Sequence, residues 1–198
     1  LLAIRFNSKK PFKLTLYNMI YEGWVEHRLE VPDSEIVTVQ IIRNIIMANS
    51  TLISALFILL GILLGFYGTN ISGDLLVFGV QVVFFKIALN VAVIIFCILN
   101  FVMSVRSINR CLLLMTGDPR KYNLGEMNGI EGAKEAFIAS KNHWMFGIRA
   151  LFFLVASMTW FLSSLLLIIT SISITIYLIL VRDIKRIEIK QKTLDETQ

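Results

Sequence analysis

Long hydrophobic runs separated by short polar segments dominate this sequence. The run from Ile45 to Tyr67 carries no charged residue, and a polar segment that begins at Glu35 leads into it. About 20 apolar residues in a helix cross the roughly 30 Å hydrocarbon core of a bilayer. The pattern therefore predicts a membrane-spanning helix over residues 34–66, with its first turns projecting into the cytoplasm.

The second run, residues 75–105, is hydrophobic apart from Lys86 and a few amides. A helix that starts at Asp74 places Lys86 near mid-bilayer, where an unpaired ammonium costs at least ~2.5 kcal/mol. A helix from Lys86 to Arg106 has the length of one crossing, bracketed by two cations, and leaves 75–85 as an outer extension or a re-entrant segment. The second interpretation avoids the burial cost, and both remain open.

Residues 146–181 form a third run, too long for one straight crossing, in which Arg149 is the charged residue. This length suits a hairpin of two helices that turns near Ser163-Ser164. The pattern predicts an all-α, polytopic transmembrane bundle with four spans in this chain and long helices that extend into the cytoplasm. The bundle is expected over 34–182, followed by a charged cytoplasmic tail over 183–198.

The polar segments predict the orientation of the bundle. Lys and Arg gather in 1–33, in the expected cytoplasmic loop 106–146 and in the tail, so these segments and both ends of the chain are expected in the cytoplasm. Within 1–33, an aromatic helix face either rests in the membrane interface or packs on the protein's own cytoplasmic helices. This face consists of Tyr17, Tyr21 and Trp24.

Polar and small residues form stripes along two of the predicted spans. The second span has an intramembrane polar seam at helical spacing, in which Lys86, Asn90 and Asn100 are the most polar members. Small residues let helix backbones approach closely, and amides in lipid need partners. We therefore predict that a face of the first span meets this seam. The pairing sets Ser50, Ser54, Gly61 and Gly65 against Asn90, Cys97, Asn100 and Ser104.

Composition agrees with membrane residence and excludes other classes. Of the 198 residues, 56% are hydrophobic, and the mean hydropathy is +0.72, whereas soluble domains are about 45–50% apolar. The net charge of +5 flanks the hydrophobic runs, which indicates attraction to anionic lipid headgroups and not to nucleic acid. Cys97 and Cys111 show no disulfide or metal spacing.

One set of polar residues is a candidate binding site at the cytoplasmic edge. Arg43, Arg106 and Arg149 each mark the cytoplasmic end of a different predicted span, so we expect all three at one depth. Guanidinium groups favour phosphate and carboxylate. Ordinary positively charged helix flanks are the alternative. The candidate anion or headgroup ligands are Arg43, Arg106, Arg149, Gln40, Asn44 and Ser104.

No catalytic pattern is present in the sequence. His27 and His143 lack partners at ligand spacing, no phosphate-binding loop follows a strand, and paired carboxylates are absent from the spans. We expect a non-catalytic binding or accessory protein of the cell membrane without metal or cofactor, a homo-oligomer or a subunit of a membrane complex, that contacts membrane lipids. The alternative is an oligomeric ion channel or pore, anion-selective in preference to cation-selective, lined by the Asn and Ser stripe. A membrane enzyme is the third class, and the missing catalytic residues disfavour it.

Several short motifs resemble an uncharacterised family of plant and prokaryotic membrane proteins, the domain of unknown function five-nine-nine. The segment VQIIRNIIMANS is similar to one of its motifs, and the similarity covers nearly the whole chain. The opening LLAIRFNSKKPFKLT resembles the end of the family's first helix, which implies a further helix before Leu1. The chain departs from the plant pattern at Ser163-Ser164, where that pattern has Gly-Pro. Further matches are Lys86, Ser104 and Arg106, and Trp144, Gly147, Arg149 and Ala150.

Overall fold

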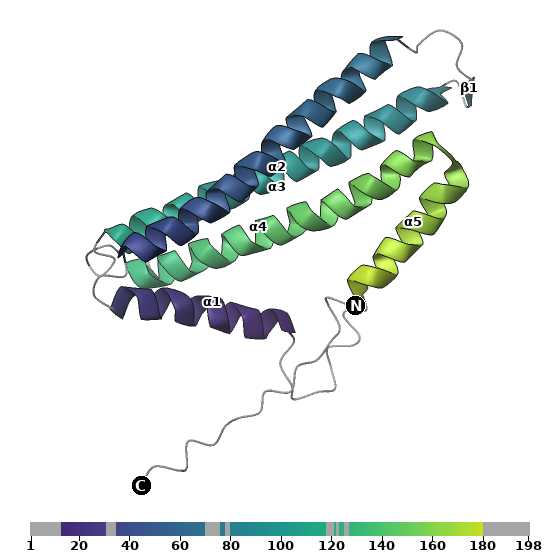
Figure 1. Cartoon of the computed structure of the whole chain (residues 1–198). Coiled ribbons are helices and arrows are strands. Elements are labelled where there is room, and N and C mark those ends of the chain that lie inside the picture. Colours follow the sequence, from purple (N-terminus) through teal and green to yellow (C-terminus); the bar gives the residue numbers. More distant parts are fainter. Residues whose placement is uncertain are drawn as a thin grey trace.

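Three long helices form the body of the computed structural model: α2 (Glu35–Thr69), α3 (Val82–Thr116) and α4 (Gly129–Met158) (Figure 1). α1 (Lys13–Glu30) lies beside the beginning of α4, and α5 (Ser164–Tyr177) folds back from its end. The structure describes residues 13–30, 35–69, 76–77, 80–117, 121, 123–124 and 127–179. The tail over 183–198 lies outside these described residues. The helix predicted over 34–66 is confirmed by α2, which is long and apolar enough to cross a membrane.

A two-stranded hairpin stands before α3. β1 (Leu76–Val77) pairs antiparallel with β2 (Val80–Gln81), and α3 begins at the next residue. The helix therefore starts at neither of the two residues considered from the sequence. Lys86 lies in the first turns of α3, not near its middle. This is the arrangement that avoids a deeply buried ammonium.

Much of the segment 106–146, expected as a cytoplasmic loop, is helical in the structure. α3 continues to Thr116, and α4 starts at Gly129 and runs without interruption for 30 residues. A second hairpin, β3 (Asn123–Leu124) with β4 (Met127–Asn128), joins them. Asn128 caps α4: its side chain accepts from the Glu131 backbone N–H, while the Glu131 carboxylate accepts from the Asn128 N–H. This reciprocal capping box satisfies N–H groups that a helix start leaves unpaired.

The expected turn of the last hairpin is confirmed. α4 passes through the 3-10 turn η3 (Thr159–Phe161), and extended Ser163 caps α5. The described part of α5 has 14 residues, about 21 Å of helix. Among the described residues, three helices are long and apolar enough to cross a membrane: Ile36–Gly65, Val83–Thr116 and Gly129–Phe161. The prediction of four spans is therefore supported for three.

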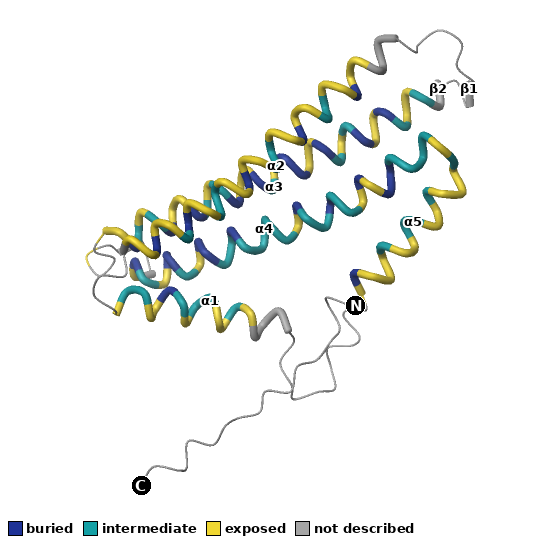
Figure 2. The backbone as a smooth tube through the Cα atoms, viewed as in Figure 1, coloured by how far each residue is buried: buried dark blue, intermediate teal, exposed yellow. Residues whose placement is uncertain are grey.

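α3 is the central helix of the bundle. It packs against both α2 and α4, and its buried residues recur along its whole length (Figure 2). One hydrophobic cluster lies at the end where α1 packs and includes Val25, Ile42 and Ile108. A second lies further along and includes Leu56, Phe101 and Leu154. Each cluster draws residues from α2, α3 and α4, so both hold the three long helices together.

The predicted pairing of two polar stripes is wrong. On α2, the small residues Ser50, Ser54, Gly61 and Gly65 are exposed, and apolar residues such as Leu56 and Leu63 face the bundle instead. The α3 seam is largely buried, but its partner is α4. Ser157 Oγ donates to Asn90 Oδ1 at 2.7 Å, and the Ser104 and Ser140 hydroxyls lie 3.1 Å apart. Branched side chains of α2 fill the space beside α3, so its small residues are left facing outward.

α1 packs on the protein's own helices, which was one of the two alternatives. The Phe137 ring of α4 stacks on Trp24 at 5.1 Å between centroids and meets Tyr21 edge-on at 5.3 Å. Val25 is completely buried. Lys134 and Glu26 form an ion pair between the same two helices.

Candidate functional site

The structure separates the three arginines of the predicted site. Arg43 and Arg106 are exposed, and Arg149 is half-buried. Ser104 contacts Ser140, so these residues mark a common level of the antiparallel helices α3 and α4. Arg106 lies two residues to one side of this level and Arg149 nine residues to the other, about 16 Å apart along the bundle. The expectation of one depth for all three arginines is therefore wrong.

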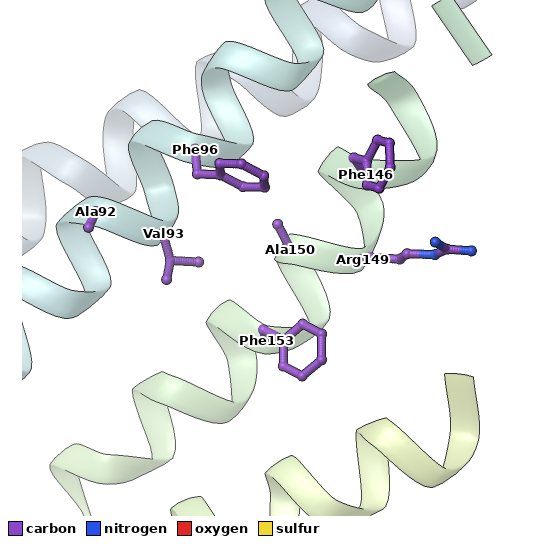
Figure 3. A pocket seen from close by; sticks show the side chains of 7 residues that line it. All are labelled: Ala92, Val93, Phe96, Phe146, Arg149, Ala150 and Phe153. Carbon is purple, nitrogen blue, oxygen red and sulfur yellow. The ribbon is translucent and has the colours of Figure 1, made fainter. Parts of the chain in front are cut away.

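Arg149 belongs to a different surface feature. It borders a hydrophobic groove of about 490 Å³ between α3 and α4, and Figure 3 shows its guanidinium directed away from α3. The other lining residues are Ala92, Val93, Phe96, Phe146, Ala150 and Phe153. The groove has no second polar side chain with which Arg149 could hold an anion.

Two of the predicted residues, Asn44 and Ser104, do lie in one cavity. It has a volume of about 450 Å³ and is formed by α1, α2, α3 and α4. We call it the Lys141 cavity, after the cationic side chain in its wall. It is lined by Tyr21, Ile41, Asn44, Ile45, Ala48, Ser104, Ile108, Phe137, Ser140, Lys141 and Trp144. Gln40, Arg43 and Arg106 are not among these residues.

Lys141 supplies the positive charge at this level of the bundle. It follows Ser140 directly, so the Ser104–Ser140 contact sets it near the level of Arg106. Its ammonium donates to Asn18 Oδ1 and lies 5.4 Å from the centroid of the Tyr21 ring. Both partners are neutral and both belong to α1. Within the part of the chain that the structure describes, no carboxylate pairs with Lys141.

The two serines of the cavity have no proton left for an anion. Ser140 Oγ donates to the Ser104 carbonyl oxygen at 3.0 Å, which uses its one proton. The 3.1 Å contact between the two hydroxyls then requires Ser104 to donate to Ser140. Both oxygens can only accept further bonds. Ser104, predicted as an anion ligand, instead joins α3 to α4.

Asn44 is a second hydrogen-bond donor in the wall of the Lys141 cavity. It lies on α2, and no hydrogen bond of its side chain occurs within the described residues. Its amide therefore offers two N–H groups, and Lys141 retains two after the bond to Asn18. The cavity thus combines donors from two helices with apolar walls, such as Ile45 and Ile108. This combination suits an anionic group attached to an apolar body.

The intramembrane seam serves the packing of the chain itself. Lys86 donates to the Trp160 carbonyl oxygen at 3.0 Å, and its ammonium lies 5.5 Å from the centroid of the Trp160 ring. Asn90 is completely buried. Asn100 donates to the Phe96 carbonyl oxygen at 2.9 Å and lies 3.4 Å from His143 Nδ1. Within the single chain, α4 therefore covers much of this seam.

Lys141 is the residue that sequence reasoning missed. The sequence pattern predicts Lys141 near the end of a short helix within the cytoplasmic loop, and so not among the cations at the ends of the spans. The signal was present as Asn128 followed three residues later by Glu131, which is the spacing of a helix start. A helix from that point carries Lys141 onto the same span as Arg149. Among the described residues, no three His, Cys, Asp or Glu side chains gather as metal ligands would.

These observations place the protein in the class of multi-pass helical bundles, with membrane-length apolar helices and a cationic cavity near one end. Within that class, the chain belongs to the family described as "Protein of unknown function, DUF599", whose profile matches residues 4–186. The resemblance drawn from the motifs is confirmed. Neither a curated protein nor a solved structure matches the chain.

Proposed function

We propose that this protein is a non-catalytic membrane protein that binds an anionic group in the Lys141 cavity, on the cytoplasmic side. The observation that carries the proposal is an ammonium in the wall of a largely apolar cavity, whose partners among the described residues are both neutral. Phosphate and carboxylate oxygens form strong charge-assisted hydrogen bonds with such a group. The ligand is a lipid headgroup or a soluble anion of the same chemistry.

The proposal includes the placement of the chain in the membrane. We propose that α5 belongs to a fourth span, because it returns antiparallel along α4. Thr159 and Thr170 lie 3.1 Å apart, and further down the Phe152 and Tyr177 rings lie 6.0 Å apart. The Lys and Arg bias of the sequence supports a cytoplasmic location for both ends. The outward small-residue face of α2 supports assembly into homo-oligomers or larger membrane complexes.

The cavity contains its own fluorescent reporter, because Trp144 lines it. The chain has 3 tryptophans, so Trp24→Phe with Trp160→Phe leaves Trp144 alone. This protein is placed in nanodiscs of phosphatidylcholine with added phosphatidylglycerol, with bromine atoms on one lipid at a time. We expect brominated phosphatidylglycerol to quench Trp144 more than its molar share predicts. In a separate arm, inorganic phosphate is added to pure phosphatidylcholine nanodiscs to detect a soluble anion.

Two matched variants test the role of the cavity cation. Lys141→Gln is expected to reduce binding of the anion about tenfold, because a charge-assisted hydrogen bond contributes about 1.5 kcal/mol. Arg106→Gln removes a cation of similar level that lies outside the cavity, and is expected to leave binding unchanged. Equal quenching by both brominated lipids, together with no response to phosphate, contradicts the proposed function. Thermal unfolding of each variant shows whether it folds.

A further inference from the structure

α1 contributes one wall of the Lys141 cavity, and this wall is held less firmly than the others. Of residues 17–30, only Val25 is buried. Tyr17, Met19 and Ile20 of the same helix are between 42% and 57% exposed. Segments with few buried apolar contacts open at lower free-energy cost than a packed core. α1 is therefore an element that can leave the bundle while α2, α3 and α4 stay packed.

Several of the contacts that dock α1 are also contacts of the cavity. Lys141 lines the cavity and donates to Asn18 on α1. Tyr21 of α1 lines it directly, and Phe137 lines it while packing against both Tyr21 and Trp24. The Asn18 Oδ1 faces the ammonium, so its amide nitrogen keeps two N–H groups beside the cation. An occupant of the cavity thus meets α1 and α4 together.

We propose that α1 is a movable wall of the anion site, and that a bound anion favours its docking. The inference rests on the proposed function and deepens it. An occupant that contacts Tyr21 and the Lys141–Asn18 pair binds the docked state better than the undocked one, so it shifts the population toward docking. By reciprocity, the anion raises the docking equilibrium constant by the same factor by which the docked state binds the anion more tightly than the undocked state.

Val25 offers a way to loosen α1 without touching the cavity. It is completely buried and is not a lining residue. Val25→Ala removes two buried methyl groups and is expected to raise the undocked population severalfold. Because the apparent affinity falls in proportion to the docked fraction, a fall of that fraction to about a third to a fifth weakens binding of phosphatidylglycerol about threefold to fivefold, which is the loss we expect. Leu63→Ala, which removes a buried leucine of α2 from a cluster that contains no residue of α1, is the control.

The distance between α1 and α3 reports docking directly. Spin labels are attached to Met19→Cys on α1 and Leu113→Cys on α3, both exposed positions, in full-length protein whose Cys97 and Cys111 are replaced by Ala. Pulsed electron spin resonance is recorded in nanodiscs with and without phosphatidylglycerol. We expect Val25→Ala to broaden the distance distribution in phosphatidylcholine and phosphatidylglycerol to narrow it again. With Lys141→Gln added, the anionic lipid should no longer narrow it.

The two proposals fail in different ways. If phosphatidylglycerol quenches Trp144 but leaves the distances in Val25→Ala unchanged, the movable wall is refuted and the binding function stands. A wild-type affinity in Val25→Ala, with a visibly broadened distribution, also refutes it. If neither phosphatidylglycerol nor phosphate reaches Trp144, the proposed function and this inference fall together.

Discussion

The glycines of this bundle differ in how closely neighbouring side chains approach them. A Cβ atom placed on Gly147 of α4 lies 2.7 Å from Cε1 of Phe101, a fully buried ring of α3. At Gly61 and Gly65 of α2, a Cβ atom meets nothing within 4 Å. The close approach of α3 and α4 thus depends on Gly147, while the α2 glycines face outward. The Gly147 position matches the Gly of the family motif.

At this scale we predict that Gly147→Ala destabilises the bundle and Gly65→Ala does not. The added methyl group forces Phe101 out of a packed position, which costs about 1–3 kcal/mol. The stability of both variants is measured as the free energy of unfolding in mild detergent. This value comes from a denaturant titration followed by circular dichroism. Gly65→Leu is expected to leave that free energy nearly unchanged but to lower the oligomeric mass in native mass spectrometry. Equal stability of Gly147→Ala and the wild type contradicts the assigned helix contact.

At the scale of the elements, α3 and α4 are joined by polar groups placed along their whole contact. Near the turn, Lys86 bonds the Trp160 carbonyl, and one turn further Ser157 donates to Asn90. Closer to α1, the hydroxyl groups of Ser104 and Ser140 form a further polar contact between α3 and α4. A polar group in lipid needs a partner inside the protein, so these pairs fix the register of the two helices as well as their contact.

The Asn90–Ser157 pair predicts a measurable coupling between helices. We expect Asn90→Leu and Ser157→Ala each to destabilise the protein, and the double variant to lose less than the sum. The coupling energy from the double-mutant cycle should be about 0.6 kcal/mol, the average for such bonds between membrane helices. Asn100→Leu paired with Ser157→Ala is the control, because Asn100 bonds elsewhere. Strict additivity for Asn90 and Ser157 contradicts a direct bond.

At the scale of the whole molecule, the two ends of the bundle differ in chemistry. The end near α1 carries Lys141, Arg106 and the ion pair of Lys134 with Glu26. Near the α4–α5 turn, the apolar Leu162 is 80% exposed, and the cation Lys86 is bonded to the Trp160 carbonyl oxygen. Lys and Arg are enriched on the cytoplasmic side of membrane proteins. This asymmetry supports the proposed orientation, with the Lys141 cavity facing the cytoplasm.

Single cysteines at the two ends test that orientation. In a chain with Cys97 and Cys111 replaced by Ala, we expect a membrane-impermeant maleimide added to intact cells to label Leu162→Cys and to spare Lys121→Cys. Both positions are exposed, so accessibility in the folded protein does not limit the reaction. After the cells are opened, both should react. The reverse pattern on intact cells would place the cavity outside.

The sequence by itself identified the apolar segments that can cross a membrane, because long uncharged runs can satisfy their backbone in lipid only as helices, but it did not show that α4 begins as early as Gly129. It also located α2 and the turn at Ser163 from local signals. Only the tertiary structure shows that the α2 glycines face outward and that Lys141, not Arg149, lines the same cavity as Asn44. These facts depend on how segments far apart in the chain align. In lipid-facing helices almost every side is apolar, so hydrophobic periodicity indicates neither the inward face nor the register.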